Sequence, residues 1–249
     1  MENNKATLMF LKQLIQKEKF QPGIVGLFIN HNFLIRTLLF SAIRKRAHLL
    51  TGVLLDFGCG TKPYKSFFKN TSSYIGVDYK IEGRENKQRE VDVFYDGTTI
   101  PFEDKKFDSI LCTEVLEHVF NIDELLQEFN RVLKINGAAL ITTPFMWEEH
   151  EMPYDFARYT TPALKSMYTK NGFEIIENTK SGNYLTVIFQ FQLNYIKNIL
   201  PENKFLKHFF LFPFIFLFNF LGTIFSICLP TDQTAYFNNV FVLVKKSDL

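Results

Sequence analysis

The sequence predicts an α/β fold built on a seven-stranded, mostly parallel sheet with helices on both faces. Between residues 53 and 178, short apolar runs alternate with stretches of helical periodicity, a pattern that favours a parallel sheet. A glycine-rich turn follows the first apolar run, and a long hydrophobic insertion precedes the last strand. The predicted strands are residues 53–57, 73–78, 91–94, 107–112, 138–142, 173–178 and 236–245.

The segments between these strands are predicted to be helices or loops. Residues 63–70 begin with a proline suited to a first helical turn, and residues 81–90 are polar enough for a loop or a short helix. A further helix is predicted to begin at Asn121 and to end at Gly137. Another begins at Pro162 and runs through Tyr168, as its composition indicates.

Length and composition place the chain among globular proteins. Its 249 residues suffice for one large domain with additions, and 47% hydrophobic against 22% charged residues excludes a disordered chain. The net charge of +2 gives no general attraction for nucleic acid. Cys59, Cys112 and Cys228 are odd in number and widely spaced. This spacing predicts no disulfide framework and no metal site, and it favours a reducing cytoplasm.

Residues 1–50 are predicted to form a helical extension without a signal peptide. A first amphipathic helix ends at Pro22-Gly23, and a second spans residues 32–49. Apolar positions at helical spacing in the first helix are Leu8, Leu11, Leu14 and Ile15. The second carries a basic cluster of Arg36, Arg44, Lys45 and Arg46. This cluster is interpreted either as a solvated face or as a patch that contacts phosphate groups of a substrate or membrane.

The turn after the first strand has the residues of a nucleotide-like binding site. The apolar run 53–55 is predicted to be a buried strand that ends in Asp56, and Gly58, Cys59 and Gly60 follow. Glycines take positive φ angles and let a ligand approach the backbone closely. A helix that starts after the turn would also present free N–H groups. The alternative is a sharp turn that binds no ligand.

The second predicted strand ends in Asp78, about twenty residues after the glycine turn. At this position a carboxylate can accept hydrogen bonds from the two hydroxyls of a ribose. The dinucleotide-binding fingerprint requires a third glycine, however, where this chain has Pro63. The pattern therefore departs from a dinucleotide site.

The segment 54–61, LLDFGCGT, resembles the first motif of the class I S-adenosylmethionine-dependent methyltransferases, which is hydrophobic-hydrophobic-Asp-x-Gly-Cys-Gly-Thr. The resemblance extends from Gly52 to Phe145 and more loosely to the end of the chain. It implies a Rossmann-like fold with two antiparallel last strands, and S-adenosyl-L-methionine as cofactor. It also implies that Asp56 orients the glycine turn and that Asp78 binds the ribose. The backbone of Gly58, Cys59 and Gly60 would contact the cofactor.

The same resemblance implies four more cofactor residues. Asp96 and Gly97 stand where the family has an aspartate that accepts a hydrogen bond from the adenine amino group. The alternative is that Asp96 only caps a turn. Thr113 and Glu114 follow the fourth strand, where the family faces the methionine end of the cofactor. His118 lies about one turn further and is interpreted as a structural histidine rather than a base.

Residues 148–160, EEHEMPYDFARYT, are too polar and aromatic for a core strand. They resemble the segment H-E-x-P-x-D-F-x-R-Y-T of methyltransferases encoded with bacterial surface-polysaccharide functions. His150 or Asp155 would deprotonate an acceptor hydroxyl, and Tyr154 and Arg158 would position the substrate. The alternative is that Arg158 and Asp155 form a pair that merely holds the loop.

A hydrophobic insertion, residues 184–230, separates the last two strands. It holds two apolar segments, 184–200 and 205–229, and the stretch 209–229 carries no charge and is long enough to span a bilayer. The strands on either side must join one sheet, so a single crossing is excluded. We therefore expect a helical hairpin on the membrane surface, and the alternative is a hydrophobic cover on the domain.

These observations predict a domain of residues 51–183 and 231–249 that O-methylates a saccharide, free or lipid-linked, in bacterial surface-polysaccharide biosynthesis. The enzyme would be cytoplasmic and peripheral on the cytosolic face of the membrane, with no nucleic-acid partner and no metal. One alternative is a methyltransferase of a small lipid or quinone-type acceptor. Another is a non-catalytic partner of glycosyltransferases that binds S-adenosylmethionine.

Overall fold

The computed structural model describes residues 14–79 and 90–249. The predictions for Leu8 and Leu11, and for all but the last residue of the 81–90 loop, lie outside the described residues. The chain forms two compact units, which are described separately below. The sheet unit comprises Ala42–Lys180 and Asn238–Leu249, and the helical unit comprises Met1–Ser41 and Ser181–Phe237.

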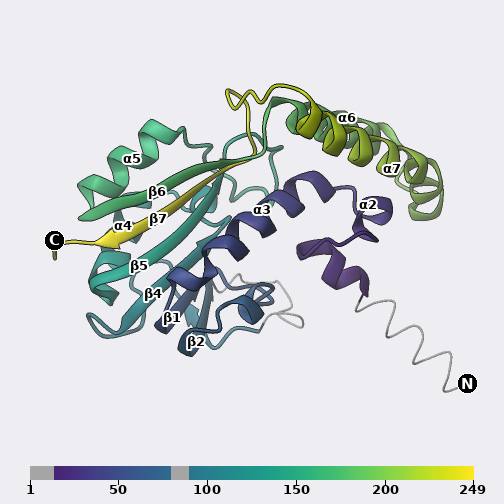
Figure 1. Ribbon diagram of the computed structural model, residues 1–249. Coiled ribbons are helices and arrows are strands. Elements are labelled where there is room, and N and C mark those ends of the chain that lie inside the picture. Colours follow the sequence, from purple (N-terminus) through teal and green to yellow (C-terminus); the bar gives the residue numbers. More distant parts are fainter. Residues whose placement is uncertain (1–13, 80–89) are drawn as a thin grey trace, which may run out of the picture. The chain divides into compact units, whose positions relative to one another are not determined.

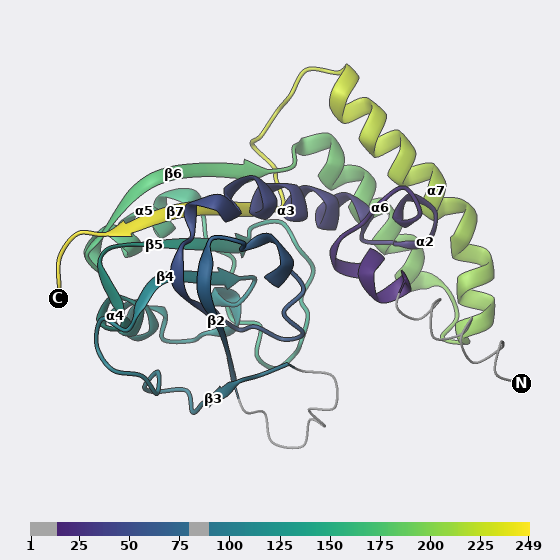
Figure 2. The same ribbon diagram turned by 60° about the horizontal axis from the view of Figure 1, so that its bottom comes forward.

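The sheet has seven strands in the order β3-β2-β1-β4-β5-β7-β6 (Figures 1 and 2). Pairs β1–β2, β1–β4, β2–β3 and β4–β5 are parallel, and β7 runs antiparallel to β5. This arrangement confirms the predicted fold class. The strands are β1 (Gly52–Phe57), β2 (Thr71–Tyr79), β3 (Val93–Tyr95), β4 (Phe107–Thr113), β5 (Leu133–Pro144), β6 (Phe173–Ser181) and β7 (Asn238–Lys245).

Helices cover both faces of this sheet, with α4 on one and the end of α3 on the other (Figure 1). Buried side chains of β1, β4 and β5 meet those of α4 and α5 in one core, which includes Leu55, Ile110, Phe129, Ile141 and Tyr168. Burial of such apolar surface is the main favourable term in folding. The helical elements of the sheet unit are η1 (Ala47–Leu49), η2 (Lys65–Phe67), η3 (Leu116–His118), α4 (Ile122–Val132) and α5 (Thr161–Lys170).

The helix predicted at residues 63–70 is wrong, because the described connection from β1 to β2 contains only the short η2. Pro63 disfavours the right-handed helical conformation of the residue before it. Lys62 lies in the left-handed region, with φ +49°. Lys62 then runs over Gly76, where a Cβ would lie 2.3 Å from its Cε, to pair with Asp92. The Lys62 side chain is buried whereas that of Asp92 is 47% exposed, and this long-range pair fixes the connection. In the described residues no helix N-terminus therefore lies beside the glycine turn.

The helix predicted from Asn121 to Gly137 ends earlier, since α4 stops at Val132. Leu133 already pairs with Phe107 of β4, and the strand register shifts before Ala138 pairs with Ser109. Pairing with β4 therefore places residues after Val132 in strand β5, although their local sequence predicts a helix. Helix α5 and the end of α3 agree with their predicted ranges to within a few residues.

The helical unit holds the predicted hydrophobic insertion as two helices, α6 (Tyr184–Ile199) and α7 (Lys204–Cys228). They pack through a small apolar cluster centred on Leu193, Leu211 and Ile215. The same unit also contains a helical stretch at residues 14–20, α2 (Gly26–Ile29) and the first part of α3 (Phe33–Arg46). Side-chain amides tie α6 and α7 to the N-terminal segment: Gln190 donates to the carbonyl of His31, and Asn219 donates to those of Leu27 and Asn30.

One member of the predicted basic cluster is not available to phosphate groups. Arg46 is 5% exposed, and its guanidinium donates to Glu177 Oε1 at 2.5 Å and to Thr179 Oγ1 at 2.7 Å. It therefore joins α3 to β6 within the sheet unit. Arg44 and Lys45 are exposed and remain candidates for contact with anions.

Candidate active site

The glycine turn lies at the carboxyl end of β1, at the edge where ligands of open α/β sheets bind. Gly58 has φ +74°, and a Cβ there would lie 2.2 Å from Val115 Cγ2. Gly60 has φ +50°, and a Cβ there would meet nothing within 4 Å. Any side chain is thus excluded at Gly58 by packing, and at Gly60 it would be strained by the backbone conformation.

The N–H groups of this turn are bonded within the protein. Those of Gly58 and Cys59 donate to the carbonyl of Val77, and that of Gly60 donates to Asp78 Oδ2 at 3.1 Å. Contact of this turn with a ligand would therefore use the Cα surfaces of the two glycines rather than free N–H groups. Cys59 is buried and does not line the cavity described below.

Asp56 lies beneath the turn and not in the cavity. It is 3% exposed, and Tyr74 donates its hydroxyl to Asp56 Oδ2 at 2.6 Å. Burial raises the pKa of Asp56 to about 7, although the Tyr74 hydrogen bond and the nearby Lys62 ammonium oppose this shift. Asp56 would therefore orient the turn from below, without contact with a ligand in the cavity, and this role stays a prediction.

A cavity of about 500 Å³ opens beside the turn in the sheet unit. Gly58, Gly60 and Asp78 line it at the ends of β1 and β2, and Tyr154 of the 148–160 loop also lines it. The other lining residues include Tyr79, Tyr95, Gly97, Glu114, Val115, His118, Phe120, Asn121, Glu124, Glu151 and Phe156. Residues predicted for the cofactor and for the acceptor therefore meet at one cavity.

The remaining predicted cofactor residues differ in their placement. Asp96 does not line the cavity, and its Oδ1 accepts from the backbone N–H groups of Thr98 and Thr99 and from the Thr98 hydroxyl. These bonds cap a turn, as in the alternative for this residue, and the contact of Asp96 with adenine stays a prediction. Gly97 does line the cavity, whereas Thr113, the last residue of β4, does not.

Glu114 lines the cavity in a strained conformation with φ +55°. Its carboxylate accepts hydrogen bonds from Thr142 Oγ1 at 2.8 Å and from Asn238 Nδ2 at 2.6 Å. Left-handed backbone at a residue other than glycine persists only where its surroundings fix it, and such residues cluster at functional sites. The placement of Glu114 therefore supports its predicted role in the site.

Asp155 and Arg158 form a buried pair that holds the 148–160 loop. The guanidinium donates to both oxygens of Asp155 at 2.5 and 2.7 Å, and it also donates to the carbonyls of Glu148 and Ala157. The Arg158 hydrogen bonds lower the pKa of Asp155 to about 2. A carboxylate with this pKa and a 1% exposed side chain is a poor base, which favours the structural alternative. The catalytic role of Asp155 and Arg158 stays a prediction.

The loop is anchored to η3 by several contacts. The ring Nδ1 of His118 bonds the carbonyl of Tyr154 at 2.8 Å, and the N–H of Phe156 donates to the carbonyl of Glu117. The rings of His118 and His150 meet edge to face, with centroids 4.8 Å apart. Burial lowers the pKa of His150, which favours its neutral form. These contacts bring the loop to the cavity edge formed by η3.

Comparison with known proteins identifies the family. A family model described as a methyltransferase domain matches residues 55–141, which run from β1 to β5 and include the glycine turn. The segment from β1 to β5 is thus a methyltransferase domain of the class I S-adenosylmethionine-dependent kind. This assignment confirms the predicted family, the methyltransferase class and S-adenosylmethionine as cofactor. The roles of the individual site residues remain predictions.

Three similar proteins illustrate the range of this fold. The ubiquinone biosynthesis O-methyltransferase of Rickettsia akari is 31% identical over 104 residues, which cover 39% of this chain and 41% of that protein. The cyclase SpnF has a TM-score of 0.55 at 18% identity, over 84% of this chain and 80% of its own. The phosphoethanolamine N-methyltransferase 2 of Haemonchus contortus, solved with S-adenosyl-L-methionine, has a TM-score of 0.53 at 17% identity, over 92% of this chain and 59% of its own.

Proteins with this fold catalyse different reactions. The two solved structures share the fold of this chain, and one of them is a cyclase, so the fold alone does not define the reaction. The chain spans about two fifths of the length of its Rickettsia akari relative. The acceptor must therefore be argued from the site itself.

The structure also brings together a group that sequence spacing missed. Glu117, His118 and His150 offer carboxylate and imidazole atoms that all lie within 4.8 Å of one another. No metal site was predicted, because His150 is far from the other two in sequence and no ligand spacing was visible. The ends of β4 and β5 lie side by side in the sheet, which brings the segments that follow them together.

Proposed function

We propose that the protein is an S-adenosylmethionine-dependent O-methyltransferase whose acceptor is a saccharide hydroxyl in cell-surface polysaccharide biosynthesis. The observation that carries this proposal is the single cavity shared by the glycine turn, Asp78 and the 148–160 loop. S-adenosylmethionine supplies a methyl group that is electrophilic because it is bound to a sulfonium. The chain must then hold the acceptor oxygen in line with this methyl group and let its proton leave.

At one part of the cavity, Asp78 and the glycine turn suit the nucleoside of the cofactor. A carboxylate can accept hydrogen bonds from both ribose hydroxyls, and Gly60, where a Cβ would meet nothing within 4 Å, leaves the backbone open to close approach. Glu114 is a carboxylate fixed by two hydrogen bonds, and it would face the ammonium group of the methionine part. These residues support the predicted cofactor site on the side of β1, β2 and β4.

The rest of the lining suits a polar acceptor with apolar faces. Tyr154, Phe156 and Phe120 are aromatic, and their planar faces can cover the C–H surface of a sugar ring. Glu151 and Asn121 provide acceptor and donor groups for hydroxyls. A saccharide would use both kinds of contact, which favours it over a purely apolar substrate.

A quinone-type acceptor is the second candidate. The Rickettsia akari relative is named as a ubiquinone biosynthesis O-methyltransferase, and the cavity also has apolar lining from Val115, Val119 and Leu125. A catechol-like ring would occupy the aromatic part of the cavity and would make fewer hydrogen bonds with Glu151 and Asn121 than a saccharide. The third candidate is a binding partner of glycosyltransferases that retains the cofactor site but transfers no methyl group.

One transfer experiment separates these candidates. Purified full-length protein is incubated with S-adenosylmethionine carrying a tritiated methyl group and with one of two acceptors, a lipid-extracted oligosaccharide pool or a catechol precursor of ubiquinone. The proposal expects base-stable label in the oligosaccharide pool. Label in the catechol alone would replace the saccharide by a quinone, and cofactor binding without transfer to either pool would favour the non-catalytic partner.

We also propose that the helical unit associates with a membrane surface on its cytosolic side. The stretch Phe209–Cys228 of α7 has 20 residues, is long enough to cross a membrane and is only 22% buried. Helix α6 has 16 residues, about 24 Å at 1.5 Å per residue, which is shorter than a hydrocarbon core of about 30 Å. It also buries Gln190 and Asn194, so the two helices do not form a spanning pair.

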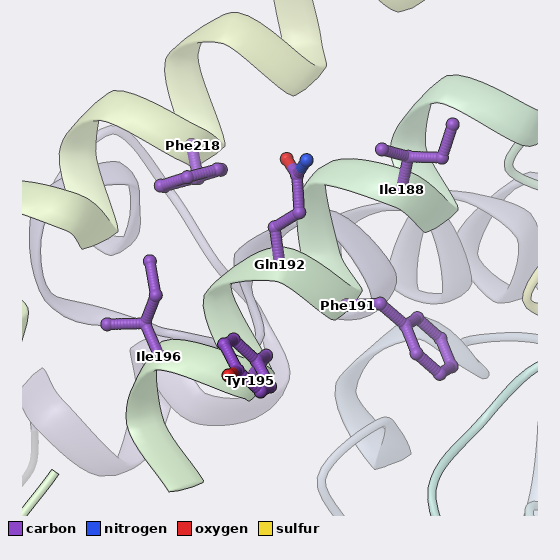
Figure 3. A pocket seen from close by; sticks show the side chains of 6 residues that line it. All are labelled: Ile188, Phe191, Gln192, Tyr195, Ile196 and Phe218. Carbon is purple, nitrogen blue, oxygen red and sulfur yellow. The ribbon is translucent and has the colours of Figure 1, made fainter. Parts of the chain in front are cut away.

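The exposed surface of these helices suits lipid chains. Large apolar side chains that remain exposed on α7 include Phe209, Phe210, Phe212, Leu217, Phe220 and Ile227. An open groove of about 510 Å³ lies between α6 and α7 and is lined by Ile188, Phe191, Gln192, Tyr195, Ile196 and Phe218 (Figure 3). Contiguous apolar patches of this kind mark sites that bind membranes or partners. Surface binding would concentrate the enzyme where lipid-linked acceptors are found.

A further inference from the structure

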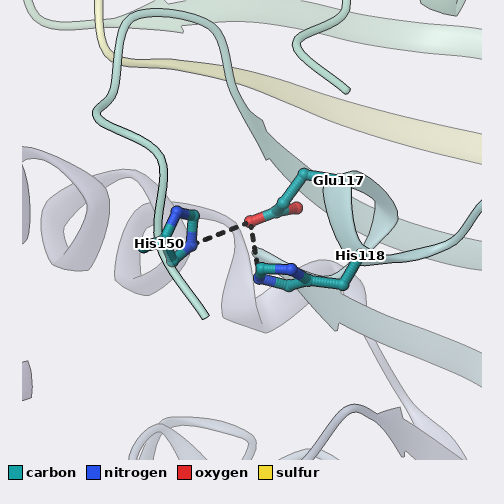
Figure 4. Close-up of side chains that lie close together, drawn as sticks. All are labelled: Glu117, His118 and His150. Atoms are coloured by element: carbon teal, nitrogen blue, oxygen red, sulfur yellow. Dashed lines mark ion pairs between the residues drawn. The ribbon is translucent and has the colours of Figure 1, made fainter. Parts of the chain in front are cut away.

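The side chains of Glu117, His118 and His150 converge on one point beside the cavity (Figure 4). Glu117 Oε1 lies 3.7 Å from His118 Nε2 and 4.0 Å from His150 Nε2. Glu117 is 0% exposed, and neither of its carboxylate oxygens has a hydrogen-bond partner. A buried carboxylate without partners is costly, and a native fold retains one only where something compensates for it.

The hydrogen bonds of the two rings indicate which nitrogen faces Glu117. His118 Nδ1 lies 2.8 Å from the carbonyl oxygen of Tyr154. His150 Nδ1 lies 3.2 Å from the carbonyl of Glu148 and 3.3 Å from Asp155 Oδ2, and the Arg158 guanidinium is more distant at 3.4 Å. Each Nδ1 atom has oxygen acceptors as its nearest polar neighbours. The ring hydrogen of each neutral histidine is therefore assigned to Nδ1. The Nε2 lone pairs of both rings therefore point toward Glu117.

Two lone pairs directed at a carboxylate repel it unless a positive charge lies between them. A metal ion meets this requirement and supplies the missing partner of Glu117 at the same time. Metal-bound histidines commonly donate their other ring N–H to a backbone carbonyl, as His118 and His150 do here. The orientation of the rings is thus that of metal ligands before the ion is bound.

We propose that Glu117, His118 and His150 form a binding site for a divalent first-row transition-metal ion of the Zn²⁺ class. Two imidazoles and one carboxylate are a common ligand set of catalytic zinc, which leaves a fourth position open. At Zn–N and Zn–O distances of about 2.0–2.2 Å, tetrahedral ligand atoms lie roughly 3.4 Å apart. The three ligand atoms are already within 4.8 Å, so small side-chain rotations suffice to close the site.

The open position adjoins the cavity, because His118 is one of its lining residues. An acceptor oxygen that occupies this position would lose its hydroxyl proton to solvent more readily, since the ion stabilises the resulting anion. This role of the ion rests on the proposed function, whereas the binding site itself does not. A bound ion would also promote deprotonation of the acceptor, which Asp155 does not do while Arg158 holds its carboxylate.

The test is metal binding by the full-length protein after removal of bound ions with a chelator. Titration with Zn²⁺ followed by calorimetry should give one tight site per chain, and Co²⁺ should give the visible absorption of a low-coordinate site. Glu117→Gln, which keeps the shape of the side chain, and His150→Ala should each weaken Zn²⁺ binding at least tenfold. The control is His48→Ala, because His48 is exposed and its ring bonds the carbonyl of Lys45 outside the cluster.

The outcomes distinguish this proposal from the proposed function. If the wild-type protein binds no Zn²⁺, or if Glu117→Gln and His150→Ala bind it as tightly as His48→Ala does, the metal site is refuted. Affinity for S-adenosylmethionine, measured on the same samples, shows whether each variant retains a folded cofactor site. A tight metal site without methyl transfer to any acceptor would refute the proposed function and leave the metal site standing.

Discussion

Tyr74 donates its hydroxyl hydrogen to Asp56 beneath the glycine turn, with 2.6 Å between the two oxygens. This bond joins two neighbouring strands, since Asp56 lies near the end of β1 and Tyr74 lies within β2. It is also the main hydrogen bond that opposes the effect of burial on the pKa of Asp56, which is raised to about 7. The pair therefore makes the stability of the sheet unit dependent on pH.

Asp56→Asn should remove this pH dependence. Because the pKa of Asp56 is about 7 when folded against 3.8 as a reference, the folded state keeps a proton that the unfolded state loses. The stabilisation that the raised pKa of Asp56 gives to the folded state is thus complete below about pH 4, and it is lost as the pH rises through 7. As the pH rises from about 4 to above 7, the difference in free energy of unfolding between wild type and Asp56→Asn should change by up to roughly 4 kcal/mol. This value follows from about 1.4 kcal/mol per pKa unit.

Urea denaturation at a series of pH values measures this difference. Tyr74→Phe is the matched variant: it removes the hydrogen bond that lowers the pKa of Asp56, so the upper end of the pH window should move to higher pH. Parallel stability profiles for wild type and Asp56→Asn between pH 4 and 8 would show that Asp56 does not retain its proton in the folded state.

Asp78→Ala should weaken S-adenosylmethionine binding by about 1–3 kcal/mol, the cost of removing a charged partner of the ribose hydroxyls. Calorimetric titration of the full-length protein measures this loss. Glu103→Ala, which removes a carboxylate outside this cavity, is the control and should leave the affinity unchanged. An Asp78→Ala variant that binds the cofactor as tightly as wild type does would refute the assignment of Asp78.

The sheet and the cofactor region were predictable from sequence because their signals are local. Asp78 stands next to an apolar strand, and parallel strands bring their carboxyl ends to one edge, which places it beside Gly60. The absence of a helix at 63–70 was not predictable, because the ion pair of buried Lys62 with the distant Asp92 decides the path of that connection. The burial of Arg46 likewise depends on Glu177, which is distant in sequence.

The catalytic side of the site was harder to predict. In the sequence of the loop, His150 and Asp155 are equally plausible bases. The structure distinguishes them, because both oxygens of Asp155 accept hydrogen bonds from Arg158. The nearness of His150 to Glu117 arises from the pairing of β4 with β5, which a single sequence does not display. Structure is needed wherever the partner of a charged side chain comes from another element.

Asp155→Ala should destabilise the sheet unit, because it leaves the partly buried Arg158 guanidinium without its carboxylate. Removal of one partner of a buried ion pair costs about 3–5 kcal/mol. The loss applies above about pH 4 and fades as the pH falls through 2, since the pKa of Asp155 is lowered to about 2 in the folded state.

A double-mutant cycle with Arg158→Ala measures the coupling between the two residues by urea denaturation at pH 7. The control is Glu174→Ala, which breaks an exposed pair with Lys246 and should cost less than about 1 kcal/mol. Additive effects of Asp155→Ala and Arg158→Ala would show that the pair does not hold the loop. Catalysis by Asp155 would instead appear as loss of the acidic limb of the pH–rate profile in Asp155→Asn.

Phe209→Ser combined with Phe212→Ser should lower vesicle binding at least tenfold. Both side chains are more than half exposed on α7, and burial of one phenylalanine in an apolar environment stabilises by about 1.5–3 kcal/mol. Flotation with neutral and with anionic liposomes measures binding, and the anionic arm tests whether Arg44 and Lys45 contribute. Phe94→Ser, on β3 of the sheet unit, is the exposed control.

Wild-type protein that stays monodisperse without detergent and floats with neither type of liposome would contradict membrane association. The stretch Phe209–Cys228 would then be a cover on the protein, and the lipid-linked acceptor would lose its main support.

The most direct test of the central claim is a crystal structure of the full-length protein with S-adenosylhomocysteine, the product left after methyl transfer. The proposed site predicts that the ribose hydroxyls bond the Asp78 carboxylate and that the adenosine passes over Gly58 and Gly60. The sulfur should face the part of the cavity lined by His118 and Tyr154. Product bound elsewhere, or a cavity that stays empty at saturating S-adenosylhomocysteine, would contradict the cofactor site on which the proposed function depends.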